Sequence, residues 1–326
     1  MRLQGRNRST FSTSKCCPLT SRSRTSPSTT ADPGRRIGLL RAQLLLLLLL
    51  SSQQKPTWSS QVETKIDFDL APDSFDDQYQ GCSKQVMEEL NQGDYFTKEL
   101  ESHRNYSRAW HKAHLTWLNQ AKALPKNMTT AHAVAILVYT LNNNVSSDFT
   151  KAMASVGRSP QQYNSFSFKY LHYYLTSATQ LLRKEIIKKN GTLCYKVYHG
   201  AKDVHFKAHL GDIIRFGQFL STSFLKEEVQ KFGNQTVFSL FTCLGAPVED
   251  ISLKKEILIP PYELFEVVNI SYHPRGNWLQ LQSTGNLSTY NCQLLKASSK
   301  KCIPAHLVTA SLSLLTSVII FSKSRV

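Results

Sequence analysis

Apolar residues recur at intervals of three and four positions through the first half of the chain's central part. This spacing predicts amphipathic helices over residues 82–101, 106–123, 129–141 and 165–189. Asn190-Gly191 follows the last of these segments and is typical of a helix end. The chain from Gly81 to about Lys189 is therefore predicted to be helical.

From Thr192 onward the pattern changes to short runs of β-branched and aromatic residues, which are typical of strands. The runs cover residues 193–198, 213–216, 236–242, 256–259 and 265–270, and Gly, Pro and Asn separate them. Helices followed by strands favour an α+β fold over a parallel α/β fold. Residues 60–296 show no repeat or linker, so we expect one domain with a helical N-terminal half packed on a mixed β-sheet core.

The N-terminal end differs in composition from this central part. Residues 1–43 carry nine Lys and Arg against one acid, and seven leucines (44–50) and two serines follow. A basic region, a short apolar run and small residues predict a secretory signal over residues 1–52. A transmembrane anchor is the alternative, but it needs about 20 apolar residues.

The C-terminal end has the pattern of a glycosylphosphatidylinositol (GPI) attachment signal. Ala297 and two serines are small, a polar spacer follows, and residues 307–321 are largely apolar. This order predicts attachment at Ala297 and removal of residues 298–326. A single membrane span is the alternative, but Ser and Thr interrupt a run that is already short for one.

Composition and charge narrow the function classes. With 41% hydrophobic residues the chain is neither disordered nor a multi-span membrane protein. The formal net charge of +16 would ordinarily indicate a nucleic-acid or membrane partner. Without the two end segments, 26 Lys and Arg face 22 acids, a net charge of +4. We therefore expect no marked basic patch and no nucleic-acid partner.

Other features support export to the cell surface. Seven N-x-S/T sequons predict surface N-glycosylation, at Asn105, Asn127, Asn144, Asn190, Asn234, Asn269 and Asn286. Five cysteines follow the leader: Cys82, Cys194, Cys243, Cys292 and Cys302. In an oxidising compartment they predict two disulfides and one remaining thiol. Their spacing fits no metal site.

Three stretches of the second half share a likeness to one family. They are V-Y-H-G at 197–200, F-G-Q-F-L-S-T-S at 216–223 and K-K-E-I-L-I-P-P-Y-E at 254–263. With Q-G-C at 80–82 and F-T-C-L-G-A-P at 241–247, the chain from about residue 65 resembles the vertebrate ecto-ADP-ribosyltransferases. The resemblance implies an ADP-ribosyltransferase-type sheet core, NAD as substrate without a metal, and transfer of ADP-ribose to arginine of extracellular proteins.

The resemblance also implies which residues form the site. Active members use an Arg, a Ser in an S-T-S-like triplet and an E-x-E pair. Ser221 and Glu256 occupy the Ser and second Glu positions, His199 the Arg position, and Lys254 the first Glu position. The Arg grips the pyrophosphate through paired bonds, the second Glu stabilises the oxocarbenium charge, and the first receives the acceptor guanidinium.

The two departures predict weak activity. A neutral imidazole at residue 199 cannot form paired, charge-assisted hydrogen bonds with a pyrophosphate. One lost charge-assisted bond costs about 1.5–3 kcal/mol of binding free energy. Lys254 places a positive charge where an arginine must dock. The alternatives are a catalytically silent surface glycoprotein, such as a carrier of blood-group antigens, or an NAD glycohydrolase. Glu249 and Asp250 precede Lys254 and are candidates for a substitute acceptor acid.

Further implications of the resemblance concern binding and cross-linking. Tyr139 and Phe219 become candidate NAD-binding residues. The disulfides implied are Cys82–Cys292 and Cys194–Cys243, which leave Cys302 in the removed tail.

Overall fold

A computed structural model of the chain describes residues 64–141, 143–191, 194–202, 204–229, 236–273 and 276–299. The predicted signal over residues 1–52 and all but the first two residues of the predicted tail over 298–326 lie outside these ranges, and both stay predictions. Within the described ranges, no helix is long and apolar enough to cross a membrane.

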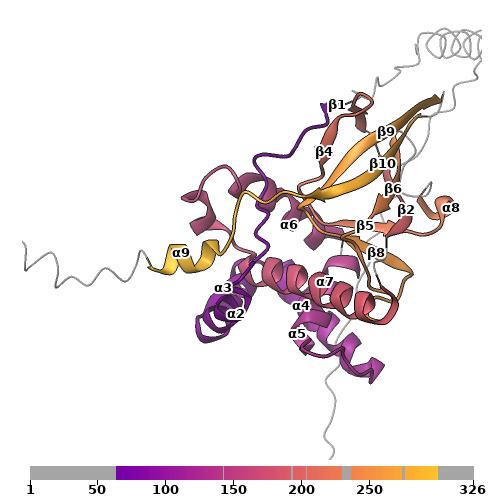
Figure 1. The fold of residues 1–326 in the computed structure, drawn as a ribbon. Coiled ribbons are helices and arrows are strands. Elements are labelled where there is room, and N and C mark those ends of the chain that lie inside the picture. Colours follow the sequence, from indigo (N-terminus) through magenta and orange to yellow (C-terminus); the bar gives the residue numbers. More distant parts are fainter. Residues whose placement is uncertain are drawn as a thin grey trace, which may run out of the picture. The chain divides into compact units, whose positions relative to one another are not determined.

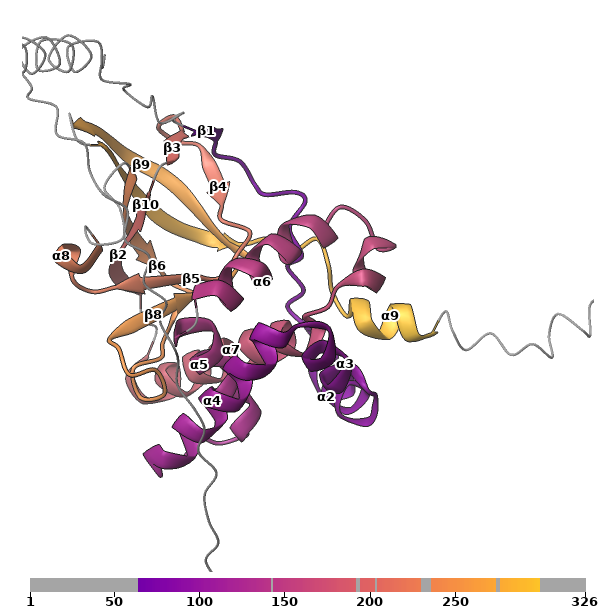
Figure 2. The same cartoon turned by 180° about the vertical axis from the view of Figure 1, so that it is seen from behind.

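The N-terminal half is helical, as the apolar spacing predicts. Its helices are α2 (Ser83–Gln92), α3 (Tyr95–Ser102), α4 (Arg104–Gln120), α5 (Thr130–Leu141), α6 (Asn143–Val156) and α7 (Lys169–Asn190), with a 3-10 turn at Gln162–Ser165. Two short helices, α8 (Lys226–Val229) and α9 (Gln293–Ser299), belong to the second half. Helices α4, α5 and α7 pack side by side below the sheet (Figure 1). In the view from behind, α4 and α6 lie nearest the viewer (Figure 2).

Two details differ from the predicted helices. The segment 82–101 is divided at Gly93 and Asp94, where a Cβ on Gly93 would lie 2.7 Å from the ring of Tyr95. Helix α6 was not predicted, because its first residues are polar. Its buried residues nevertheless follow helical spacing, as Val145, Phe149, Met153 and Val156 show.

The second half forms a mixed sheet, as expected. Its strands are β2 (Tyr195–Ala201), β4 (Ile213–Arg215), β5 (Leu220–Ser223), β6 (Thr236–Thr242), β7 (Ala246–Pro247), β8 (Glu256–Ile259), β9 (Glu263–His273) and β10 (Gly276–Asn286). Their order is β4-β9-β10-β6-β2-β5-β8-β7, with β10 and β6 parallel and the other pairs antiparallel. Strands β1 (Thr64–Asp67) and β3 (Val204–Lys207) form a separate parallel pair.

Strand β10 is the largest strand missing from the prediction. Its residues 276–286 are mostly polar, with Trp278, Leu279 and Leu281 as the apolar ones. Pairing with both β9 and β6 stabilises it, and this pairing is invisible in a local pattern.

Two hydrophobic clusters pack against strands β5 and β8, which carry Ser221 and Glu256. Leu258 and Phe219 pack into the cluster formed by the helices, where α5 is buried from 132 to 140. Leu220, Ile257 and Ile259 pack into a second cluster within the sheet. Because side chains alternate along the chain, β8 contributes to both clusters, and Phe219 and Leu220 at the start of β5 pack into different ones.

Two disulfides and a buried ion pair join distant segments. Cys82 is bonded to Cys292 and Cys194 to Cys243, the pairing that the family resemblance implied. Arg215 is paired with Asp76, and both side chains are fully buried. These links hold the N-terminal segment, the sheet and the C-terminal helix together.

Candidate functional site

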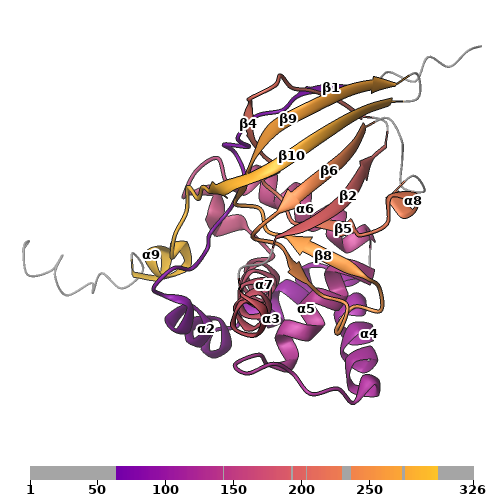
Figure 3. The ribbon, with the colours of Figure 1, turned by 45° about the vertical axis from the view of Figure 1, so that its right-hand side comes forward.

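His199, Ser221 and Glu256 lie on three neighbouring strands, β2, β5 and β8 (Figure 3). Strand pairing sets their positions, since Ser223 is directly opposite Glu256 on one side and Tyr198 on the other. Directly opposed residues share a face of the sheet. Ser221, two residues before Ser223, therefore shares the face of Glu256.

Glu256 begins β8, and its side chain is 13% exposed. Its Oε1 lies 3.6 Å from Nζ of Lys254, and its Oε2 is buried without a hydrogen-bond partner among the described residues. Burial raises the pKa of Glu256, while the positive charge of Lys254 and the hydroxyl of Ser221 lower it. The carboxylate is thus paired with a cation through one oxygen, while the other is buried.

His199 meets Ser221 through the main chain only. The ring Nδ1 donates a hydrogen bond to the carbonyl oxygen of Ser221 at 3.0 Å. Alternation along β2 places His199 on the face opposite to Tyr198, where its ring stacks on Phe238 at 6.3 Å. Burial lowers the pKa of His199, so the imidazole is neutral at pH 7.

Tyr139 and Phe219 lie behind Ser221 rather than beside it. The Tyr139 hydroxyl donates a hydrogen bond of 2.5 Å to the carbonyl oxygen of Phe219, and the two side chains are 8% and 2% exposed. Burial raises the pKa of Tyr139, and the charge of Glu256 raises it further. These residues fix the start of β5 from helix α5, and their side chains offer little surface to a ligand.

A carboxylate that sequence reasoning missed lies at the end of β5. The Ser223 hydroxyl donates a hydrogen bond to Oε2 of Glu228, on α8, at 2.7 Å. The charge of Glu228 also raises the pKa of Glu256. The main-chain carbonyl of Asp250 accepts a hydrogen bond from Lys122 of the helical half at 2.8 Å, and the roles of Glu249 and Asp250 stay predictions. A usable signal was present, since Glu228 closely follows the S-T-S triplet.

The two most specific motif stretches are joined by one buried side chain. Glu263, from P-P-Y-E, accepts hydrogen bonds from the Thr242 hydroxyl at 2.6 Å and the Cys243 amide at 2.7 Å, both in the T-C-L-G-A-P stretch. Gly245 is required there, because a Cβ would lie 2.7 Å from Ile257. These contacts position β7 against β8 and so position Glu256.

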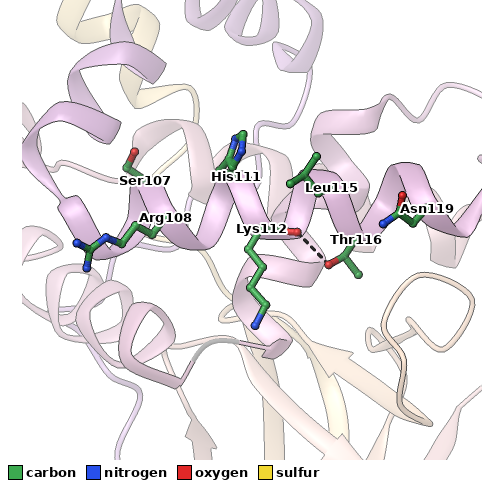
Figure 4. A pocket seen from close by; sticks show the side chains of 7 residues that line it. All are labelled: Ser107, Arg108, His111, Lys112, Leu115, Thr116 and Asn119. Carbon is green, nitrogen blue, oxygen red and sulfur yellow. Dashed lines mark hydrogen bonds between the residues drawn. The ribbon is translucent and has the colours of Figure 1, made fainter. Parts of the chain in front are cut away.

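A hollow of about 520 Å³ lies away from these residues, along the outer face of α4 (Figure 4), and none of the predicted site residues line it. Arg108 and Lys112 line this hollow, and with Arg104 they are exposed on α4 at four-residue intervals, a local cationic face that the net charge did not indicate. Within the described ranges, no three metal-ligating side chains gather.

Comparisons with known proteins agree with this geometry. The family model for NAD:arginine ADP-ribosyltransferase matches residues 68–289. The chain is 72% identical to human ecto-ADP-ribosyltransferase 4 over 301 residues, which cover 92% of this chain and 96% of that protein. It is 35% identical to chicken erythroblast NAD(P)(+)--arginine ADP-ribosyltransferase, over 81% of this chain and 88% of the relative.

A solved structure shares the fold. The crystal structure of the eukaryotic mono-ADP-ribosyltransferase ART2.2 matches with a TM-score of 0.59 and 30% identity, over 70% of this chain and 98% of that one. A mutant of ART2.2 crystallised in complex with NAD matches with a TM-score of 0.58 and 29% identity, over the same shares of the two chains. The chain belongs to the NAD:arginine ADP-ribosyltransferase family.

Proposed function

We propose that this chain is a cell-surface ADP-ribosyltransferase that takes NAD as substrate and transfers ADP-ribose to protein arginine weakly. The observation that carries the proposal is the 3.6 Å contact between Lys254 and Glu256, at the position where the family's active members have an acid. Glu256 supplies the cleavage chemistry, and Lys254 opposes the binding of a cationic acceptor.

The unpartnered oxygen of Glu256 supports NAD cleavage. Oε2 is buried without a hydrogen-bond partner among the described residues, and a ribose hydroxyl of NAD would supply one. The negative charge of Glu256 then stabilises the positive charge that develops on the ribose as the nicotinamide bond breaks. Burial raises the pKa of Glu256, while Lys254 and the Ser221 hydroxyl oppose this shift and favour the charged form.

The two family departures account for the weakness. His199 is neutral and its Nδ1 is occupied by the main chain, so it offers the pyrophosphate no charge. Each lost charge-assisted bond corresponds to about a 10- to 100-fold loss of affinity. Lys254 adds a like-charge barrier to the acceptor guanidinium.

NAD hydrolysis is a second candidate activity. The same unpartnered Oε2 of Glu256 supports it, and water needs no acceptor acid. Hydrolysis therefore requires Glu256. It does not require an acceptor-binding acid at residue 254.

The experiment uses the full chain on the surface of cultured cells that lack other such enzymes. Cells receive NAD labelled on the adenosine side, with agmatine as a small guanidine acceptor. We expect weak transfer by the parent, a rise of about tenfold or more in Lys254→Glu, and none in Glu256→Gln. If the parent transfers no label at normal surface levels, the proposed activity is wrong and a silent surface glycoprotein remains.

The surface location is part of the proposal. Relatives include a human protein named GPI-linked NAD(P)(+)--arginine ADP-ribosyltransferase 1, 33% identical over 83% of this chain. Among the sequon asparagines whose side chains the structure describes, all five are exposed: Asn105, Asn127, Asn144, Asn269 and Asn286. Phosphatidylinositol-specific phospholipase C should release the protein from cells, and Ala297→Trp should prevent surface delivery. Retention after phospholipase treatment would contradict the lipid anchor.

A further inference from the structure

Glu228 is held at the edge of the candidate site by the strand that carries Ser221. Ser223 ends β5 and lies directly opposite Glu256 in the pairing of β5 with β8. Its hydroxyl donates to Glu228 at 2.7 Å and accepts from the Leu225 amide at 3.1 Å. One hydroxyl thus fixes the turn into α8 and places the Glu228 carboxylate beside the residue that faces Glu256.

The topology places Glu228 and Lys254 at the same strand ends. Because β5 and β8 are antiparallel, the end of β5 adjoins the start of β8. Glu228 follows β5, and Lys254 precedes β8. Lys254 is paired with Glu256 at 3.6 Å, which partly neutralises its charge. Glu228 is exposed and forms no ion pair with any Lys or Arg of the described ranges.

The neighbouring charges leave Glu228 as the carboxylate best placed for an acceptor. Lys226, on the same short helix, lies over the ring of Trp278 at 4.1 Å and so points toward β10. Glu227 is exposed, and within the described ranges the hydrogen bond from Ser223 of β5 goes to Glu228 instead. The charge of Glu228 raises the pKa of Glu256, which is consistent with this placement.

We propose that Glu228 is the acceptor-binding carboxylate of this chain and binds a guanidinium in place of the family acid that Lys254 replaces. The inference rests on the proposed function, because it assigns the acceptor side of the same site. The acceptors are cationic guanidines, which Glu228 binds on the β5 side of Glu256.

In the proposed reaction one bond breaks, one bond forms and one proton is released. The bond between ribose C1 and the nicotinamide nitrogen breaks, and its electron pair leaves with neutral nicotinamide. A guanidinium nitrogen of the acceptor forms the new bond to C1. The proton that this nitrogen loses passes to the Glu228 carboxylate and then to solvent. Glu228 therefore both binds the acceptor and takes its proton.

The test compares Glu228→Gln with the matched control Glu227→Gln in full-length protein purified in detergent. Agmatine binding is measured by saturation-transfer NMR, which does not depend on turnover. We expect Glu228→Gln to weaken agmatine binding by about 10- to 100-fold, the loss of one charge-assisted bond, and Glu227→Gln to stay within about twofold of the parent. Ser223→Ala, which frees the carboxylate, should give an intermediate loss.

Two outcomes overturn the inference: a parent that does not bind agmatine, or equal binding by the two Gln variants. NAD cleavage without acceptor is measured on the same preparations, and the control Glu227→Gln should leave it unchanged. Absent cleavage in every variant, together with the expected agmatine contrast, would refute the proposed function but not the role of Glu228. Intact cleavage without that contrast would refute the role of Glu228 alone.

Discussion

The buried ion pair between Arg215 and Asp76 predicts a large loss of stability on truncation. Arg215 is 1% exposed and Asp76 is 0% exposed. Arg215 also donates hydrogen bonds to the carbonyl oxygens of Leu70 at 2.8 Å, Ala71 at 2.9 Å and Leu287 at 3.0 Å. Arg215→Met removes all these donors and leaves the buried Asp76 side chain without its cationic partner, although the amides of Thr289 and Tyr290 still bond to it.

The expected magnitude follows from this burial. Breaking a buried pair by removing one partner costs about 3–5 kcal/mol, because an uncompensated charge remains. In a domain of this size, 1 kcal/mol shifts the Tm by about 2–4 °C, so Arg215→Met should lower the Tm by about 6–20 °C. The matched control is Arg158→Met. Arg158 lies 3.2 Å from Asp73, but the two side chains are 61% and 59% exposed. Such exposed pairs contribute about 1 kcal/mol or less.

The assay is thermal unfolding, followed by circular dichroism, of protein purified from cells that express the full chain. Arg215→Met/Asp76→Asn should recover part of the loss, because a neutral amide replaces the stranded carboxylate. If Arg215→Met melts within about 3 °C of Arg158→Met, the buried charge does not have the assigned effect. If the double variant is no better than Arg215→Met, the cost comes from lost packing instead.

Three further predictions concern pH and cross-linking. Lys254 lowers the pKa of Glu256, so Lys254→Gln should move the acid limb of the NAD-cleavage profile to higher pH. Burial raises the pKa of Glu99 to about 8 from 4.5, so the folded protein keeps a proton that the unfolded chain releases. Stability should fall from about pH 4.5 to 8, and Glu99→Gln should flatten this dependence in Tm measurements. Replacing Cys82 and Cys292 by Ser opens a link of sequence separation 210, which should cost about 4–5 kcal/mol and lower the Tm accordingly.

Each of these predictions has a contrary result. An unchanged acid limb in Lys254→Gln would show that the 3.6 Å pair does not act on Glu256. A parent Tm that does not change between pH 5 and 8 would show that Glu99 ionises freely. Equal melting of the Ser variant and the parent would show that other contacts hold the two ends together.

Local periodicity was sufficient wherever an element buries its own stripe of apolar residues. Helix α5 is apolar nearly all round and is buried nearly all round, so its place in the core was readable from residues 130–141. Strand β10 is stabilised by two neighbours, and helix α6 begins in polar residues, so neither was predicted. In both cases the information lies in contacts with distant segments.

The site residues also divide into those that the sequence predicts and those that depend on tertiary contacts. Ser221 and Glu256 were readable because each lies within a short motif, and the opposition of Lys254 to Glu256 follows from their closeness in the chain. The neutral ring of His199, held by the Ser221 carbonyl, depends on the pairing of β2 with its neighbours. Glu228 is distant from Glu256 in sequence and meets it only because β5 and β8 pair antiparallel.

By itself, the sequence determined the family resemblance, the helical and strand halves, and the two substitutions that predict weak transfer. These are local properties of motifs and periodicity, which do not depend on how the chain folds. Only the tertiary structure decided which charges meet at Glu256 and which side chains are buried behind Ser221. The reason is physical: electrostatic effects on a carboxylate depend on distance through space and on burial, and strand pairing sets both.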